Sequence, residues 1–148
     1  MITIADTPHS IALGTAIGFF FGFSPLFGLK TVLSVAVAWV CKSNKLAAAL
    51  AVALHDVALP LMPAIYLWEY KVGVLALRGH LPPRAAFRHI PIREYMNWTT
   101  FFNVGLPILV GSLLLAAPFA IIVYFAMRGV VERARELQTD PAPPAPQA

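Results

Sequence analysis

Residues 101–127 constrain this chain more than any other feature, because they form a long apolar run without Lys, Arg, Asp or Glu. As a helix, with a rise of roughly 1.5 Å per residue, this run would be roughly 40 Å long. It is therefore long enough to cross a hydrocarbon core of roughly 30 Å with some tilt. Pro107 and Pro118 interrupt the run, but packed membrane helices tolerate proline. The run predicts a transmembrane helix at about residues 99–135.

The composition of the whole chain indicates the same environment. Of its 148 residues, 59% are hydrophobic and only 12% are charged, whereas soluble domains carry roughly 25% charged residues. We therefore expect an all-α integral membrane protein with a single membrane domain over residues 1–136. The remaining residues, 137–148, are rich in Pro and Ala, which predicts a disordered tail.

Pro and Gly break the first apolar segment into two short helices, which we expect at about residues 9–23 and 29–43. Pro25 and Gly28 form the break. Each apolar run is roughly 20 Å long as a helix, which is too short to span the hydrocarbon core comfortably. Backbone at such a break must be buried in protein or reach water, because lipid offers no hydrogen bonds. The pattern predicts a broken or re-entrant helical hairpin.

The next apolar segment repeats this arrangement, with helices expected at about residues 46–59 and 63–78. Pro60 and Pro63 interrupt it, and a proline inside a helix removes a backbone hydrogen bond and bends or ends the helix. Two arrangements fit this pattern, namely one long kinked span and a second hairpin.

Residues 80–97 form a polar stretch that we expect to lie along the membrane surface. Three arginines, Arg84, Arg88 and Arg93, alternate there with apolar side chains. Interfacial segments bury their apolar side chains among the lipid headgroups and keep the basic ones in the polar layer. We therefore predict that these three arginines contact lipid headgroups.

Basic residues at two places give conflicting signals for the topology. The long apolar run ends in Arg128, Arg133 and Arg135, and such basic flanks mark the cytoplasmic side. The arginines within residues 80–97 also favour the cytoplasm, although a single span would place them on the opposite side. Either the last segment turns back within the membrane, or one basic cluster is misplaced.

Gly14, Gly18 and Gly22 recur at every fourth position of the first predicted helix. On a helix this spacing makes a flat stripe that lets another backbone approach closely. The stripe favours tight helix packing, and the alternative is that it lines a pore or a ligand groove.

Lys30, His55 and Asp56 lie inside apolar stretches, where a charged side chain costs roughly 3 kcal/mol on insertion scales. An ion pair between Lys30 and Asp56, with His55 beside it, is the simplest hypothesis. Lys30 can instead extend its ammonium group to the membrane surface. In a third hypothesis, these residues handle a proton, an ion or a substrate.

Two further polar residues have simpler interpretations. Glu69 lies beside aromatic residues in the sequence, so we expect it at the membrane surface, paired with Lys71 or Arg78. Cys41 is the single cysteine and lies at the end of an apolar run. It therefore forms no intrachain disulfide, and we expect a buried thiol.

No catalytic, metal or cofactor site is predicted. The sequence contains no G-x-S-x-G, H-E-x-x-H or P-loop motif, and its 4 histidines are too scattered to indicate a metal site. Lysines and arginines lie at the ends of apolar runs rather than along one helix face. This layout indicates membrane lipids as partners and argues against nucleic acid.

Residues 10–31, SIALGTAIGFFFGFSPLFGLKT, resemble the bacterial domain-of-unknown-function family 2062 in their glycine-stepped helix and Pro-Leu-Phe-Gly break. The likeness extends over most of residues 8–127, and the chain departs from the family's Asn-Pro pair at residues 56–60. Membership would imply a multi-pass protein of the bacterial inner membrane. Some relatives carry a glycosyltransferase domain, which implies an envelope glycosyltransferase as a partner. Later similar positions are Lys45, Pro63, Tyr66, Tyr70, Gly73, Gly111 and Ser112.

Two functions fit these features. The first is a non-enzymatic scaffold or accessory protein of the cell envelope, whose glycine faces pack with a second copy or another protein. The alternative is a small transporter or lipid-translocating protein with its site at the broken helices, because interrupted membrane helices with charges near mid-membrane are typical of transport sites.

Overall fold

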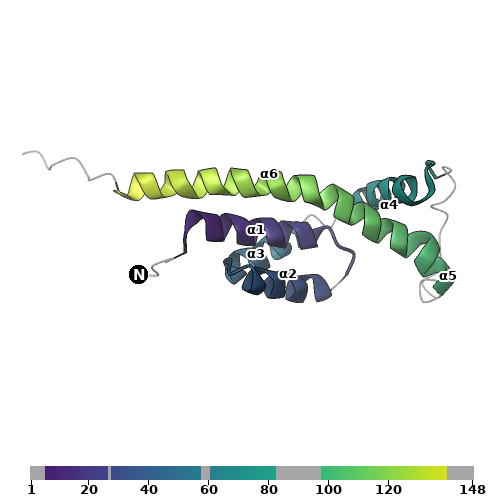
Figure 1. Ribbon diagram of the computed structural model, residues 1–148, viewed down its shortest axis with the longest axis horizontal. Coiled ribbons are helices and arrows are strands. Elements are labelled where there is room, and N and C mark those ends of the chain that lie inside the picture. Colours follow the sequence, from purple (N-terminus) through teal and green to yellow (C-terminus); the bar gives the residue numbers. More distant parts are fainter. Residues whose placement is uncertain (1–5, 27, 58–60, 83–97, 140–148) are drawn as a thin grey trace, which may run out of the picture.

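The computed structural model describes residues 6–26, 28–57, 61–82 and 98–139, and all regular elements in these ranges are helices. The predicted all-helical fold is therefore confirmed for this part of the chain (Figure 1). The main helices are α1 (Pro8–Gly22), α2 (Leu29–Val40), α3 (Lys45–Asp56), α4 (Met62–Arg78) and α6 (Leu106–Thr139), and α6 follows the short α5 (Trp98–Thr100) and a π-helical turn (Phe101–Gly105).

Local sequence signals set where several helices begin and end. The Asn44 side chain accepts a hydrogen bond from the Ala47 backbone N–H (2.7 Å) and so caps the start of α3. Gly28 before α2 and Gly79 after α4 have φ angles of 77° and 72°, which glycine adopts without steric penalty. The break between α1 and α2 therefore lies where Pro25 and Gly28 predict it.

α1 is the central helix, with α6 along one side of it and α2 and α3 along the other (Figure 1). α1 and α3 run in the same direction, because Gly14 faces Asn44 and Gly18 faces Ala48. α2 connects these two helices and runs the opposite way. α1 and α2 thus form a helical hairpin that lies beside only one part of α6.

α6 runs antiparallel to both α1 and α4 but meets them at different places along its length. The ring of Tyr124 contacts His9 at the start of α1, and the Pro107 backbone lies against Gly73 near the end of α4. Since α3 is parallel to α1, α3 and α4 run in the same direction, antiparallel to α6. Of the two predicted arrangements, this is the long broken segment and not the second hairpin.

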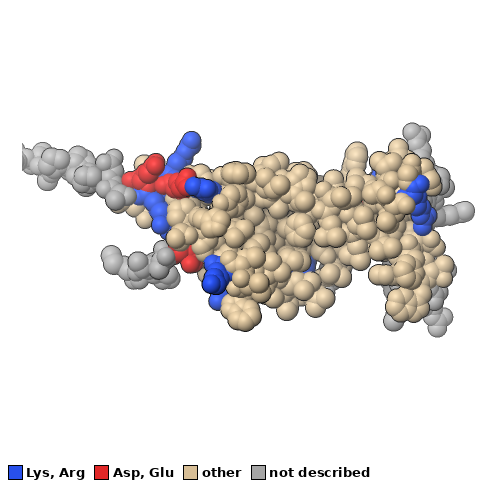
Figure 2. Space-filling model, in the orientation of Figure 1, with Lys and Arg blue, Asp and Glu red and all other residues tan. Residues whose placement is uncertain are grey.

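The surface between the two ends of the molecule is mainly apolar. On the face shown in Figure 2, Lys, Arg, Asp and Glu gather toward the end of the long axis where α6 ends, and Lys and Arg lie at the opposite end. Large apolar side chains on α2, α3 and α6 are more than half exposed, among them Trp39, Leu50, Ile122 and Phe125. Within the described ranges, one helix (Trp98–Gln138) is long and apolar enough to cross a membrane, and only 22% of its most apolar window is buried.

The continuity of α6 corrects one topology hypothesis. The helix runs without interruption past Pro118 to Thr139, so the last segment does not turn back. It also includes residues 137–139, which the sequence assigned to the tail. The rest of that tail, 140–148, most of the stretch 80–97 with its three arginines, and Pro60 lie outside the described residues.

Two smaller predictions also change. Cys41 is exposed and not buried, because α2 ends one residue before it at Val40 and the chain turns there toward α3. α2 is therefore shorter than the predicted helix at 29–43. Pro63 lies in the first turn of α4, where the missing N–H has no intrahelical partner to lose.

Candidate functional site

Ionisable and polar residues, three of them buried and two partly exposed, extend from the level where α1 and α3 end into the first half of α4. Two come from the end of α3, one from the first turn of α2 and two from the first half of α4. We call this group the break-level cluster. Its members are Lys30, His55, Asp56, Tyr66 and Glu69.

Lys30 and Asp56 form the predicted ion pair. The Lys30 side chain is only 4% exposed, and Asp56 is 42% exposed. An ammonium group extended to the membrane surface would leave Lys30 exposed, so the pairing hypothesis holds and that alternative is wrong. Lys30 also lies near the carboxyl end of α3, where the helix dipole favours a cation.

His55 lies in an aromatic pocket at the end of α3. Its ring packs against Phe19 and Phe23 of the first helical segment, with centroid distances of 5.6 and 4.9 Å. Phe23 in turn stacks on Phe119 of α6. The side chain fits because Gly22 leaves room, since a Cβ there would lie 2.8 Å from the His55 Cγ. His55 therefore connects the end of α3 to both α1 and α6.

Glu69 is the most deeply buried ionisable side chain among the described residues, with an exposed fraction of 0%. Gly111 of α6 lies directly against the Glu69 backbone, so the two helices approach closely here. Within the described ranges, neither carboxyl oxygen has a hydrogen-bond partner. An ionised carboxylate buried without a partner is strongly unfavourable, so this geometry favours the neutral acid.

The prediction that Glu69 pairs with Lys71 or Arg78 is therefore wrong. Lys71 lies over the Trp68 ring, 5.3 Å from its centroid. Arg78 Nη2 donates a hydrogen bond to Asn103 Oδ1 at 2.9 Å. Lys71 thus contacts a neighbour on α4 and Arg78 a residue of the π-helical turn before α6, whereas the Glu69 backbone lies against Gly111 of α6.

Tyr66 links the two halves of the cluster. Its phenol lies within electrostatic range of the carboxyl groups of both Glu69 and Asp56. Tyr66 and Glu69 are three residues apart on α4 and therefore share one helix face. Sequence analysis missed both as site residues, although a glutamate within the apolar segment 63–78 was a visible signal.

Three residues at and near the cluster carry buried polar atoms without a hydrogen-bond partner in the described ranges. They are the Ser34 hydroxyl, His55 Nδ1 and both Glu69 carboxyl oxygens. Ser34 lies one turn after Lys30 on the buried face of α2. Buried polar groups are nearly always hydrogen-bonded in native proteins, so each exception needs an explanation, such as local strain, a catalytic role or a bound water or ion.

The glycine stripe serves internal packing. A Cβ at Gly14 or Gly18 would overlap backbone atoms of α3, and one at Gly22 would overlap His55. The stripe therefore lines an interface within the chain, not a pore. Gly73 and Gly111 do the same between α4 and α6, and sequence analysis did not identify this second interface because these glycines lie on different helices.

The cluster has the chemistry of proton or ion handling. The ammonium of Lys30 and the imidazole and carboxyl groups of His55 and Asp56 lie at adjoining ends of α2 and α3, and a phenol and a second carboxyl group lie in the first half of α4. His55 packs against Phe23, and the Glu69 backbone lies against α6. Among the described residues, no group of three or more His, Cys, Asp or Glu side chains is placed to hold a metal ion.

A family model described as "Uncharacterized protein conserved in bacteria (DUF2062)" matches residues 1–139 of the chain. No curated protein and no solved structure matches the chain.

Proposed function

We propose that this chain, which belongs to the bacterial DUF2062 family as the resemblance of residues 10–31 predicted, is a small proton-linked transporter of the bacterial inner membrane. The break-level cluster is its site, and Glu69 is the group that takes up and releases the proton. The observation that carries this proposal is the complete burial of a carboxyl group without a hydrogen-bond partner in the described ranges.

The distribution of charge supports a multi-pass membrane location. Charged side chains at both ends of the long axis and exposed apolar ones between them (Figure 2) suit headgroups and hydrocarbon, respectively. In this proposal the end that carries Arg128, Arg133 and Arg135 is cytoplasmic. The α1–α2 hairpin then re-enters from the cytoplasm, the broken segment α3–α4 crosses outward, and α6 crosses back.

The position of the cluster supports transport. Transporter sites are typically formed near the middle of the membrane by discontinuous helices, whose ends supply polar backbone groups. Here α1 ends at Gly22 and α3 ends at Asp56, both beside Lys30 and His55. Intramembrane ionisable residues are costly, and they mark proton and ion pathways by default.

The scaffold alternative loses its specific support. Its basis was that glycine faces pack with a second copy or another protein, but those of α1, α4 and α6 pack against helices of the same chain. Transport by the cluster needs no enzymatic step and no cofactor. Membrane lipids are the surroundings of such a protein, and an envelope glycosyltransferase is compatible as a neighbour.

Proton flux into vesicles tests the proposal directly. The purified protein is reconstituted into vesicles with a trapped pH-sensitive dye, and valinomycin with a potassium gradient drives protons inward. We expect faster acidification than in protein-free vesicles and a return to their rate in Glu69→Gln. The control Glu132→Gln makes the same change at an exposed position on α6 and should keep the wild-type rate. Equal rates for wild type and Glu69→Gln would refute the proposal.

Carbodiimide labelling gives a second readout that needs no transported solute. Dicyclohexylcarbodiimide dissolves in lipid and adds covalently to protonated carboxyl groups, and mass spectrometry locates the adduct. Labelling of Glu69 requires both a protonated carboxyl and transient separation of α4 from α6, because the side chain is fully buried. We expect an adduct at Glu69 that decreases as the pH is raised. Absence of this adduct at every pH would count against proton exchange at Glu69.

A further inference from the structure

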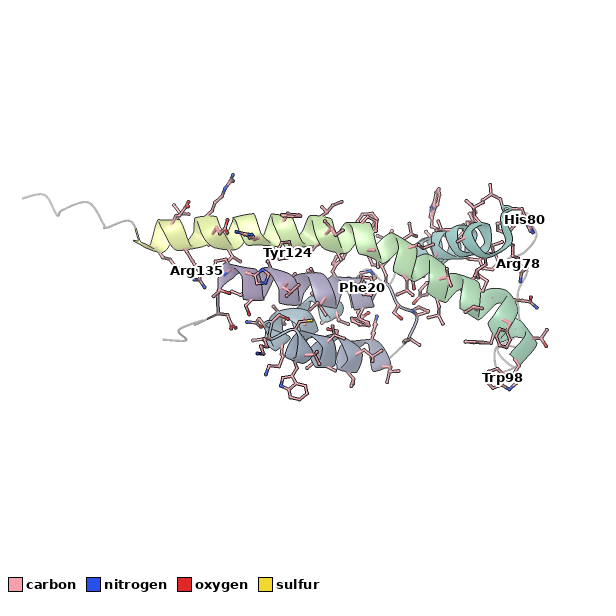
Figure 3. All side chains as sticks on the ribbon, in the orientation of Figure 1. Phe20, Arg78, His80, Trp98, Tyr124 and Arg135 are labelled. Carbon is pink, nitrogen blue, oxygen red and sulfur yellow. The ribbon has the colours of Figure 1, made fainter. Side chains whose placement is uncertain are left out.

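An apolar groove of about 440 Å³ opens on the surface between α1, α2 and α6. Aromatic and aliphatic side chains line it, and Figure 3 labels Phe20 of α1 and Tyr124 of α6, which both belong to its lining. Most of the lining comes from α1 and α6, and α2 contributes Val37. It is separate from the break-level cluster, none of whose members lines it. Further lining residues are Leu13, Ile17, Ala120 and Ile121.

The length of the groove fits one leaflet of a bilayer. Its lining on α1 extends from Leu13 to Phe21, which is roughly 12 Å along a helix axis. Half of a hydrocarbon core is roughly 15 Å thick. The groove begins near the end of the molecule that carries Arg128 and finishes toward the break level, so it covers one half of the proposed membrane thickness.

The volume of the groove suits a single hydrocarbon chain. A helix of about 10 Å diameter would occupy roughly 900 Å³ over the same 12 Å length, about twice the volume available. A helix of a second copy therefore cannot fill the groove without remaining largely outside it. One extended acyl chain is narrow enough to lie between α1 and α6.

The end of the groove near the charged surface offers donors for an anionic headgroup. Tyr124 reaches this end, where its hydroxyl is hydrogen-bonded to His9 Nδ1 at 2.7 Å. Arg128 follows one turn later on α6 and is half exposed, with its Nε donating to Glu132 Oε1 at 2.8 Å. A guanidinium carries several N–H donors in a planar fork, so Arg128 can bind a phosphate while it remains paired with Glu132.

We propose that this groove binds one acyl chain of an anionic phospholipid from the leaflet on the Arg128 side, with the lipid phosphate at Arg128 and His9. The lipid chemistry follows from the apolar lining, and the headgroup charge follows from the half-exposed guanidinium of Arg128 at the end of the groove. The proposal rests on the membrane location proposed above and is independent of proton transport.

Native mass spectrometry of the intact protein tests lipid retention. The protein is extracted from vesicles containing equal amounts of phosphatidylglycerol and phosphatidylethanolamine. We expect one retained phospholipid per chain, with phosphatidylglycerol strongly preferred. Ala120→Trp fills the groove and should abolish retention, whereas Ala126→Trp places the same ring on an exposed position of α6 and should not. Ile17→Trp fills the groove from α1 and replaces Ala120→Trp if that variant loses its helical circular dichroism.

Charge variants test the headgroup contact. Arg128→Gln should remove the preference for phosphatidylglycerol while one lipid remains bound, and Arg133→Gln, at an exposed position on the same helix, should keep the preference. Wild-type retention in both groove-filling variants would overturn the proposal. The proposal would also be overturned if the bound lipids had the same proportions as the vesicle. A wild-type dimer that dissociates in Ala120→Trp would overturn it as well, because a second copy would then occupy the groove. Retention with normal selectivity in a protein that moves no protons would leave this site standing and refute the transport proposal alone.

Discussion

Replacing Gly18 by Ala tests the packing of α1 on α3, on which the position of His55 depends. A Cβ at this position would lie 2.7 Å from the Ala51 Cβ and would overlap the Ala48 carbonyl oxygen. The carbonyl belongs to the backbone of α3 and cannot rotate aside as a flexible side chain can. The two helices must therefore move apart along the glycine stripe.

The expected cost can be worked out from two opposing contributions. Overpacking a well-packed interface costs about 1–3 kcal/mol, and overlap with a backbone oxygen favours the upper value of about 3 kcal/mol. Alanine is better than glycine inside a helix by about 1 kcal/mol. The net destabilisation is therefore about 2 kcal/mol, which lowers the folding equilibrium constant roughly 30-fold.

Gly129→Ala is the matched control, because it makes the same change in α6 where no atom lies within 4 Å of the new Cβ. We expect this variant to be more stable than wild type by about 1 kcal/mol, the helix-propensity gain alone. Circular dichroism during titration of mixed micelles with dodecyl sulfate would measure both free energies of unfolding. Shifts of Gly18→Ala and Gly129→Ala in the same direction and of the same size would refute the packing argument.

Three further predictions concern the break-level cluster and the topology. Lys30→Met should destabilise the protein by about 2 kcal/mol, less than the roughly 3–5 kcal/mol expected for breaking a fully buried pair, because Asp56 is 42% exposed. The double variant Lys30→Met with Asp56→Leu should recover most of the lost stability in the same titration. Equal losses of stability in the single and the double variant would contradict this prediction. Glu69→Gln should unfold at the wild-type detergent concentration, because it replaces a neutral acid by a neutral amide; a large loss would indicate an ionised, partnered carboxylate. A membrane-impermeant maleimide should label Cys41 from the cytoplasmic side. In a background without Cys41, it should label the variant His80→Cys from the opposite side. Labelling of both positions from one side would refute the proposed topology.

The sequence predicted the features that depend on local chemistry. Pro25 and Gly28 mark the break between α1 and α2 because proline and a left-handed glycine both end helices. The Lys30–Asp56 pair was also predictable. Each ion needs a partner inside an apolar segment, and few charges of opposite sign lie in those segments.

The burial of Glu69 could not be predicted from its neighbours in the sequence. Trp68 is 62% exposed and Glu69 is 0% exposed, although they are adjacent, because successive helical residues point about 100° apart. The face that becomes buried is decided by the docking of α6, which brings Gly111 against the Glu69 backbone. That contact joins residues distant in the sequence, and only the tertiary structure shows it.

The helix breaks and the Lys30–Asp56 ion pair are physically one feature. Each helix end leaves several backbone N–H or C=O groups without an intrahelical partner, and such groups cannot face lipid. α1 and α3 end at the same level, beside the stretch of α6 where Pro118 also removes a backbone donor. This polar surrounding lowers the cost of burying Lys30 and Asp56, whose charges then compensate each other. The same charges one or two turns away, among complete helical turns facing hydrocarbon, would lack that compensation, which is why the Lys30–Asp56 pair lies at the breaks.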